Sequence, residues 1–346
     1  MKTSDFDYQV PESLIAQFPS EKRDECRLLS LDRKSHGTKH YLFKDLPGLL
    51  RPGDRLIFNN TKVVPARLRC RKETGGAIEL LFTERIDALS WKALVRPAKK
   101  MRKNTALSLA GEPRIQLNVN EVPGDGSAVV TMADTAIAAS IDDLLHEYGE
   151  MPLPPYIKRK PIDSDADTYQ TVFARRPGAI ASPTAGLHFT GELMERLKQF
   201  GVDFSFVTLH VGIGTFRPVK SENPRDHEMH QENYELSSDV AEALIDTRKK
   251  GGRNIAVGTT VVRVLEHCSQ ETGYPSASTG ATRLMILPGH SFKVIDGLIT
   301  NFHVPRSTLL MLVSAFAGTE HVLKAYEEAV RLQYRFFSYG DAMIIL

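Results

Sequence analysis

The chain has 346 residues, of which 42% are hydrophobic and 25% are charged, and its formal net charge at pH 7 is +2. This composition is typical of a globular protein and excludes a disordered, fibrous or uniformly basic DNA-coating chain. The length allows two or three domains, each with its own core. The three cysteines, Cys26, Cys70 and Cys268, are far apart in the sequence, which favours inert thiols in a reducing compartment.

The N-terminus carries acidic residues where a signal peptide would have an apolar core. The longest apolar stretch, residues 309–316, is much shorter than the ~20 residues that cross a bilayer, so it predicts a buried core helix. We therefore expect a soluble, cytoplasmic protein with no membrane partner.

Strand signals dominate the first half of the chain. The first predicted strand is residues 54–59. Between residues 67 and 149, short apolar runs are separated by Gly, Pro and Asp turns; the runs are residues 77–82, 91–95, 115–119 and 128–132. Period-2 alternation in several of these short runs predicts a small antiparallel barrel or sandwich.

From residue 169 onward, predicted strands alternate with predicted helices. The helices are residues 191–200, 237–250, 261–268 and a C-terminal helix with Val322, Ala325, Tyr326, Ala329 and Val330 on one face; the strands are residues 202–211 and 254–257. The sequence therefore predicts an α/β main domain with a mixed, largely parallel sheet (residues 1–66 and 150–346). A smaller, all-β, barrel-like domain (residues 67–149) is inserted in it.

Residues 181–190 form a loop of small residues, including Pro183 and Gly186, that precedes a predicted helix. Such a loop lets backbone N–H groups approach a ligand, and a helix N-terminus favours anions. His188 is a candidate acid or base because imidazole titrates near neutral pH. The alternative is an ordinary loop in which a hydrogen-bonded histidine has a structural role.

A second loop, residues 257–263, also joins a strand to a helix and contains Gly258, Thr259 and Thr260. Open α/β sheets bind ligands at the carboxyl ends of their strands, which favours a ligand site here. Thr is also a common helix N-cap, so a purely structural helix start is an equal alternative.

Two further motifs argue against other enzyme classes. Residues 212–217 contain two glycines of a dinucleotide fingerprint, but Arg217 occupies the third glycine position, so we expect no nicotinamide cofactor. His227 and His230 are three residues apart rather than the four of zinc proteases, so we expect no metal.

Basic residues are clustered although the net charge is small. The clusters are Arg67, Arg69, Arg71 and Lys72; Lys99, Lys100, Arg102 and Lys103; and Lys158, Arg159, Lys160, Arg175 and Arg176. Such patches can hold RNA phosphates, although charge runs are usually solvated loops. The aromatic tail, residues 335–342, can stack a base or anchor the chain end in the core, and we favour the anchor.

Taken together, long blocks of the chain resemble the S-adenosylmethionine:tRNA ribosyltransferase-isomerase family of queuosine biosynthesis. The blocks include PTAGLHF at residues 183–189, AVGTT at 256–260 and DGLITNFH at 296–303, with further matches at residues 6–8, 11–17, 58–67, 149–157, 169–174, 207–212 and 335–342. The resemblance spans essentially the whole chain and is weakest in the β-rich insertion. Small departures include Cys26, where members commonly carry Ser, and Ser182, where Ala is common.

The resemblance implies an enzyme that acts on tRNA carrying 7-aminomethyl-7-deazaguanine at the wobble position of the anticodon. S-adenosylmethionine, consumed as a co-substrate, donates its ribosyl carbons to give epoxyqueuosine, while adenine and methionine leave. It also implies a monomeric, metal-free enzyme with an α/β domain and a smaller β domain.

Chemistry suggests roles for particular residues within that reaction. The candidates for proton transfer are His188, His210 and Asp341. The residues expected to bind S-adenosylmethionine are Thr184, Gly186, Gly258, Thr259, Thr260, Asp296 and Asn301. The residues expected to contact tRNA are Lys62, Arg67, Arg175 and Arg335.

Two rival functions stay open at this point. A non-enzymatic RNA-binding module explains the basic clusters but not the two ligand-type loops. A conventional methyltransferase uses the same co-substrate, but no glycine-rich loop follows an early strand.

Overall fold

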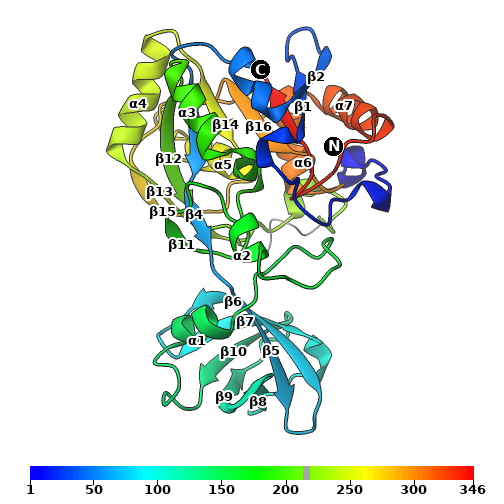
Figure 1. The fold of residues 1–346 in the computed structure, drawn as a ribbon, viewed down its shortest axis with the longest axis vertical. Helices are drawn as coiled ribbons and strands as arrows, with labels where there is room; N and C mark the ends of the chain where they lie inside the picture. The colour runs from blue at the N-terminus through cyan, green and yellow to red at the C-terminus, as the bar shows by residue number, and fades with distance from the viewer. Residues whose placement is uncertain (213–218) are drawn as a thin grey trace. The chain divides into compact units, whose positions relative to one another are not determined.

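The computed structural model describes residues 1–212 and 219–346, which divide into two compact units (Figure 1). The larger unit comprises Met1–Lys62, Pro154–Lys160 and Asp167–Leu346, and the smaller comprises Val63–Leu153 and Pro161–Ala166. The smaller unit is thus an insertion in the larger one. No helix of the described residues is long and apolar enough to cross a membrane.

The larger unit is built on a nine-stranded mixed sheet. Its strands, in spatial order, are β15 (Ser278–Thr282), β13 (Glu232–Leu236), β12 (Asp203–Leu209), β3 (Arg55–Asn59), β14 (Asn254–Val257), β16 (Gly297–Asn301), β17 (Ala342–Ile345), β1 (Arg27–Leu31) and β2 (Thr38–Leu42). The central strands β12, β3, β14 and β16 are parallel, as are β17 and β1. Antiparallel strands complete both edges.

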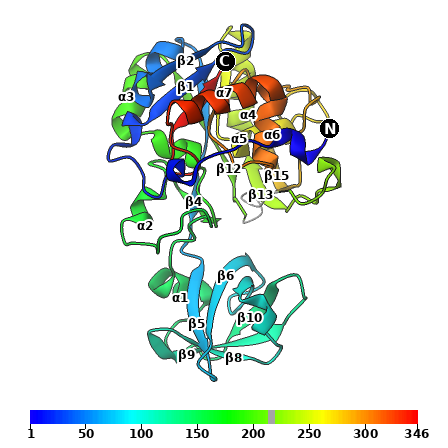
Figure 2. The same ribbon diagram turned by 90° about the vertical axis from the view of Figure 1, so that its right-hand side faces the viewer.

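Alternating side chains of the central strands enter two separate cores. In β3, Leu56 and Phe58 face one core, whereas Ile57 faces the other. Helix α3 (Gly191–Gln199) and the short 3-10 helix Phe43–Leu49 cover the first face. The second face is covered by the helices α4 (Ser238–Lys249), α5 (Thr259–His267), α6 (Thr308–Ala317) and α7 (Thr319–Arg331). Figure 2 shows α3 on one side of the sheet and α5 and α6 on the other.

The smaller unit is a closed antiparallel barrel. Its strands are β5 (Arg67–Lys72), β6 (Ala77–Arg85), β7 (Ser90–Arg96), β8 (Ala106–Leu109), β9 (Glu112–Glu121) and β10 (Ser127–Met132). Helix α1 (Ile141–Tyr148) is capped by Ser140, whose hydroxyl accepts the Asp143 N–H. Closure leaves no unpaired sheet edge, and Leu68, Leu80 and Phe82 are fully buried. The predicted fold class, an α/β unit with an inserted barrel, is confirmed.

The described chain also contains several short elements. A two-stranded sheet pairs β4 (Thr61–Val63) with β11 (Arg176–Ala179), and a four-residue helix, α2 (Asp165–Thr168), follows the barrel. Short 3-10 helices occur at Thr3–Phe6, Glu12–Leu14, Arg23–Glu25, Ala98–Lys100, Thr184–His188 and Pro224–Asp226.

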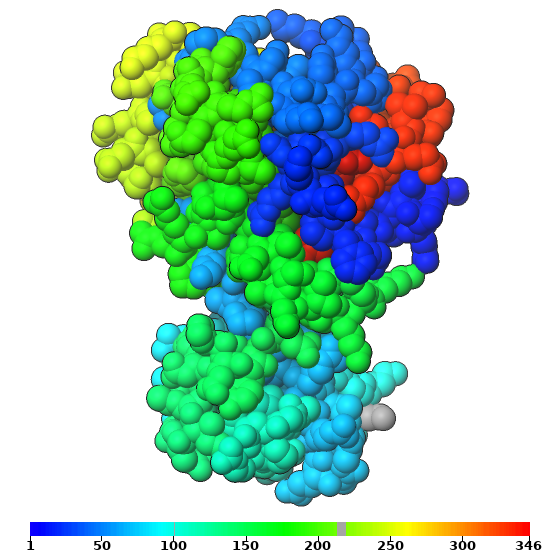
Figure 3. All heavy atoms as spheres, in the orientation of Figure 1, coloured from blue at the N-terminus to red at the C-terminus, as the bar shows by residue number. Residues whose placement is uncertain are grey.

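Segments near the two ends of the chain pair with each other in the larger unit. The backbone of Phe336 donates to Leu14 O, and Ala16 N donates to Phe336 O. Figure 3 shows the N-terminal segment, in dark blue, beside the C-terminal segment, in red. Phe336, Phe337 and Tyr339 are buried, which confirms that the aromatic tail anchors the C-terminus in the core. Strand β17, which the sequence did not predict, then enters the sheet between β16 and β1.

Candidate functional site

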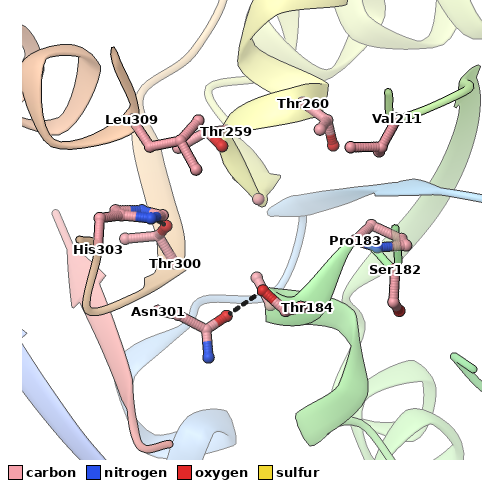
Figure 4. Close-up of a pocket in the computed structure, with 12 residues that line it drawn as sticks. Ser182, Pro183, Thr184, Val211, Thr259, Thr260, Thr300, Asn301, His303 and Leu309 are labelled. Atoms are coloured by element: carbon pink, nitrogen blue, oxygen red, sulfur yellow. Dashed lines mark hydrogen bonds between the residues drawn. The ribbon is translucent and has the colours of Figure 1, made fainter. Parts of the chain in front are cut away.

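A pocket that contains about 350 Å³ of empty space, part of it open to solvent, lies at the carboxyl ends of the parallel strands β14 and β16 (Figure 4). It is lined by Ser182, Pro183, Thr184, Ala185, Val211, Gly258, Thr259, Thr260, Thr300, Asn301, His303 and Leu309. Most polar groups in this lining are hydroxyls. Ligands of open α/β sheets bind at this edge, because loops that follow neighbouring parallel strands converge there.

A second hollow, of about 320 Å³, shares one wall with the first. The two have Thr184, Asn301, His303 and Leu309 in common. The second hollow adds Tyr156, Phe302, Val304, Ser307, Phe337 and Ser338. Together they offer a polar wall of hydroxyls and one amide and an apolar wall of aromatic and aliphatic groups.

The turn between β14 and α5 forms one wall of the pocket. Gly258 has φ +95° and ψ 149°, a backbone conformation that side chains strongly disfavour. This turn starts α5 at Thr259, two residues before the predicted start, and places Thr259 and Thr260 on the pocket. The side-chain amide of buried Asn59 donates to Thr260 Oγ1 at 3.2 Å and so fixes the Thr260 side chain. The loop is therefore both a helix start and a pocket wall.

Asn301, the last residue of β16, connects three parts of the site. Its Oδ1 accepts from the Thr184 hydroxyl at 2.9 Å, as Figure 4 shows. Its Nδ2 lies 3.1 Å from His188 Nε2 and donates to the carbonyl oxygen of Phe337 at 3.1 Å. Phe337 has φ +71°, which is uncommon for a bulky residue, and its strained backbone directs that carbonyl at the amide.

Both ring nitrogens of His188 have partners inside the protein. Its Nδ1 lies 3.1 Å from the Cys26 sulfur, and its Nε2 faces the Asn301 amide. Burial, with Arg23 and Arg335 nearby, lowers the pKa of His188 to about 3. Burial also raises the pKa of the Cys26 thiol well above its usual value. Because an amide nitrogen can only donate, Nε2 accepts from Asn301, and the neutral ring carries its proton on Nδ1, towards sulfur.

The other two residues predicted for proton transfer lie outside both hollows. The Thr61 hydroxyl lies 2.8 Å from His210 Nδ1, and burial, with Arg176 nearby, lowers the pKa of His210. The carboxylate of Asp341 accepts the backbone N–H groups of Arg27 and Arg335 at 2.8 and 2.7 Å and pairs with the Arg27 guanidinium. Asp341 thus ties together the segments that form β1 and β17.

Of the seven residues predicted to bind the co-substrate, five line the first pocket: Thr184, Gly258, Thr259, Thr260 and Asn301. Gly186 does not, because it packs beneath the loop, where an added Cβ would lie 2.7 Å from the Phe173 ring. Asp296 precedes β16 and so lies at the amino edge of the sheet, opposite the pocket. Its carboxylate accepts from the Arg248 guanidinium and from Asn254 N, both at 2.8 Å.

The four predicted RNA contacts differ in accessibility. Lys62 and Arg175 are exposed and form no ion pair within residues 1–212 and 219–346. Arg67 is held within the barrel by the Leu153 carbonyl at 3.1 Å and by Glu79. Arg335 donates to the Ser20 hydroxyl and to the Phe18 carbonyl.

Sequence reasoning missed three polar residues of the pocket: Ser182, Thr300 and His303. His303 is 8% exposed and lines both hollows. Ser182 is buried, and its hydroxyl has no hydrogen-bond partner in the described part of the chain. His303 ends the 296–303 block and Ser182 precedes the 183–189 block, so proximity to these motifs was the available signal.

Two earlier expectations concern ligands other than S-adenosylmethionine. The incomplete dinucleotide motif at residues 212–217 lies almost entirely outside the described residues. Within the described ranges, no group of three or more His, Cys, Asp or Glu side chains is arranged to hold a metal ion. The expectation of a metal-free protein stays a prediction.

The fold is that of an α/β protein with a pocket at the carboxyl edge of its sheet, the edge at which open α/β sheets bind small molecules. The model of the family described as queuosine biosynthesis protein matches residues 3–345. Two curated relatives named S-adenosylmethionine:tRNA ribosyltransferase-isomerase, from Carboxydothermus hydrogenoformans and Staphylococcus haemolyticus, are 50% and 48% identical, and the matches cover 100% of each chain. A crystal structure of S-adenosylmethionine tRNA ribosyltransferase from Thermotoga maritima matches with a TM-score of 0.57 and 39% identity, over 99% of this chain and 100% of that one.

The chain therefore belongs to the queuosine biosynthesis protein family, whose members include S-adenosylmethionine:tRNA ribosyltransferase-isomerases. Membership makes it an enzyme of the transferase class, and the resemblance seen in the sequence is confirmed.

Proposed function

We propose that this enzyme transfers and isomerises the ribosyl moiety of S-adenosylmethionine onto 7-aminomethyl-7-deazaguanine at the wobble position of tRNA. The product is epoxyqueuosine, and adenine and methionine are released. Support for the proposal comes from family membership over residues 3–345 and from a pocket whose lining suits a nucleoside. The observation that carries it is the convergence of five predicted co-substrate residues on that one pocket.

The donor set of the pocket fits S-adenosylmethionine. The hydroxyls of Thr259, Thr260 and Thr300 can bond ribose hydroxyls or adenine nitrogens, since each hydroxyl both donates and accepts. The buried Ser182 hydroxyl, which has no partner among the described residues, is available to a ligand. Leu309 and Phe337 provide apolar surface for the adenine ring and the methionyl chain.

The proposed reaction sets three demands on the chain. A C–H bond next to a sulfonium is acidified, because the carbanion forms beside positive sulfur, so removal of a C5′ proton can start opening of the ribose. The enzyme must supply a base for this proton, an acid for departing adenine, and a pocket that excludes water. The amine of the modified base can then capture the opened sugar, and methionine departs as the epoxide closes.

Lys62 and Arg175 are the strongest candidates for contacts with tRNA. Both are exposed and lack an ion-pair partner within residues 1–212 and 219–346, so their charges are available to phosphates. Arg67 and Arg335 are engaged by carbonyls and contribute mainly to local structure, although Arg335 keeps its positive charge near the site. We also propose that the enzyme acts as a monomer and without a metal ion.

The test is mass spectrometry of tRNA carrying the aminomethyl precursor after incubation with this protein and S-adenosylmethionine. We expect the mass gain of an epoxycyclopentanediol on the wobble base and one released adenine per modified tRNA. The matched control is the same tRNA with unmodified guanine, which lacks the accepting amine and should show neither change.

The same experiment distinguishes the rival functions. A methyltransferase would leave label from methyl-labelled S-adenosylmethionine in the RNA and would release no adenine. A non-enzymatic RNA-binding protein would bind the tRNA in the absence of S-adenosylmethionine. The mass of the tRNA would then stay the same with or without S-adenosylmethionine. Either result with folded protein and correctly modified tRNA contradicts the proposed reaction.

A further inference from the structure

The two hollows at the sheet edge contain few groups that can exchange a proton. Among their lining residues, only His303 and Tyr156 carry titratable side chains. The Tyr156 hydroxyl is bonded to the Ser338 hydroxyl at 2.7 Å, and burial raises the pKa of Tyr156. At neutral pH a phenol with a raised pKa keeps its proton, so it cannot act as a base. His303 is the lining residue suited to this task.

The backbone of His303 is fixed on both sides. Its N–H donates to the Tyr326 hydroxyl at 3.0 Å, and its carbonyl oxygen accepts from the Tyr8 hydroxyl at 2.6 Å. Both tyrosines are in the hydrophobic core or packed against it. The residue is thus held by the phenols of buried Tyr326 and half-buried Tyr8, from distant parts of the chain, which limits its movement relative to the pocket.

The ring of His303 is fixed through one nitrogen only. Its Nε2 lies 2.7 Å from the Thr300 hydroxyl. Its Nδ1 has no hydrogen-bond partner in the described ranges 1–212 and 219–346 and is not among their buried, unpartnered atoms. Figure 4 shows the ring beside Thr300, across the pocket from Pro183. Burial lowers the pKa of His303 to about 3, so at pH 7 the ring is neutral and one of its nitrogens carries an unprotonated lone pair.

The other candidates for proton transfer lack such a free atom in the pocket. Both nitrogens of His188 are occupied, by Cys26 and by Asn301, and the ring lies outside both hollows. His210 and Asp341 also lie outside the two hollows. His303 therefore differs from His188 in two respects: one of its ring nitrogens has no partner among the described residues, and its ring lines the hollows. Burial gives the two rings similar pKa values.

We propose that His303 is the proton-transfer residue of the reaction, with Nδ1 directed at the ribosyl carbon of the co-substrate and Thr300 as its positioning residue. This proposal rests on the proposed function. Nε2–H donates to Thr300 Oγ1, which leaves the Nδ1 lone pair open. That lone pair takes a proton from C5′, and the C–H electron pair stays on carbon beside the sulfonium. The resulting imidazolium then holds the proton that departing adenine requires.

The test compares His303→Ala and His303→Gln with the wild-type enzyme by adenine release under saturating precursor tRNA. We expect kcat to fall by about 10²–10⁴-fold in both variants, the range for loss of a general acid or base. The Kd of S-adenosylmethionine, measured by calorimetry without tRNA, should change by less than about threefold, because hydroxyls supply most of the binding. Thr300→Val should lower kcat less, since His303 is still present.

Chemical rescue separates proton transfer from a structural role. Added imidazole should restore part of kcat in His303→Ala, where the deleted ring leaves space for it, but not in His303→Gln, where the new side chain fills that space. His321→Ala is the matched control, because His321 lies on α7 and stacks on His36 at 3.4 Å, away from the pocket. Its kcat should equal that of the wild type with or without imidazole.

Three results would overturn the assignment. They are a kcat within about twofold of wild type in both His303 variants, a loss confined to KM, or no imidazole rescue in a folded His303→Ala protein that still binds S-adenosylmethionine. If His303→Ala does not fold, the kcat of His303→Gln tests the assignment of His303 instead. An inactive wild type would instead overturn the proposed function and, with it, the role of His303.

Discussion

Asn301 and His188 form a buried polar chain beside the pocket. The chain runs from the Thr184 hydroxyl through the Asn301 amide and the His188 ring to the Cys26 thiol. Every member is neutral, and each depends on its neighbour for a hydrogen bond, so the loss of one member leaves another unsatisfied. This chain holds the loop at residues 183–188 in place and so supports one wall of the pocket.

Asn301→Ala should weaken both stability and co-substrate binding. The substitution removes the partners of Thr184, His188 and the Phe337 carbonyl, and each buried group left unsatisfied costs about 1–3 kcal/mol. We expect a lower melting temperature and a raised Kd for S-adenosylmethionine, measured by calorimetry. Thr184→Val, which removes one bond of the chain, should have a smaller effect on stability. Equal stability of Asn301→Ala and wild type would contradict this account.

The depressed pKa of His188 gives the protein a pH-dependent stability. The folded-state pKa is about 3, whereas an unfolded histidine titrates near 6.5. Between these values the unfolded chain binds more protons, so stability is fully present above pH 6.5 and is lost as the pH falls towards 3. From pH 7 to pH 5, this one group should remove about 2 kcal/mol from the free energy of unfolding.

Urea unfolding at pH 7, 6 and 5 measures this dependence. The His188→Gln variant should lose about 2 kcal/mol less than wild type over that interval, because its side chain does not titrate. The same dependence in His188→Gln and wild type would show that His188 does not carry a depressed pKa.

At the scale of elements, the two edges of the central sheet differ in role. The amino edge carries two ion pairs, one between buried Asp54 and half-buried Arg253 and one between half-buried Asp296 and exposed Arg248. The carboxyl edge instead carries the hydroxyl-rich pocket and the strained turn at Gly258. Parallel strands place all their carboxyl ends on one side, which explains this separation.

Gly258→Ala should test the turn that starts α5. A Cβ there meets Ala185 and Thr260 only at 3.7 Å, so the cost is backbone strain of about 1–3 kcal/mol rather than a clash. Because the turn places Thr259 and Thr260, the KM for S-adenosylmethionine should also rise. Gly289→Ala is the matched control: Gly289 has φ +100° and open space around its Cα, so stability should fall while KM stays unchanged.

Asp296→Ala tests the amino edge. Its carboxylate forms charge-assisted bonds with Arg248 and accepts from Asn254 N, so we expect a loss of about 1–3 kcal/mol of unfolding free energy. The KM for S-adenosylmethionine should be unchanged, since the residue is at the edge opposite the pocket. A raised KM with normal stability would restore the sequence-based prediction that Asp296 binds the co-substrate.

At the scale of the whole molecule, all residues of both hollows belong to the larger unit. The barrel has its own buried core and a closed ladder of hydrogen bonds. A chain in which residues 63–153 are replaced by a short Gly/Ser linker should therefore still bind S-adenosylmethionine with a Kd within about tenfold of wild type, or about 1.4 kcal/mol.

Calorimetry on the shortened chain measures this affinity. The same shortened chain with Asn301→Ala is the control and should bind more weakly, which shows that binding occurs at the pocket. A shortened chain that is folded by circular dichroism but does not bind would mean that the barrel contributes to the co-substrate site.

Local patterns in the sequence determined much of this protein. Helices such as α3, α4 and α7 follow from periodicity and end signals, because an element that buries one face repeats its apolar residues at a fixed interval. Helix α6 follows from a continuous apolar stretch, and strands β3 and β14 were also predicted. The loops at residues 183–189 and 256–260 were recognisable because small residues and hydroxyls follow predicted strands or precede helices.

Only the tertiary structure decided which polar residues share a site. His188 and His303 are both histidines within recognisable blocks. The nitrogens of His188 contact Cys26 and Asn301, whereas His303 lines the pocket and has one ring nitrogen without a hydrogen-bond partner among residues 1–212 and 219–346. Asp296 and Asn301 are five residues apart, but they lie at opposite edges because a strand of that length crosses the sheet. Such outcomes depend on contacts between segments far apart in the chain, which no local pattern encodes.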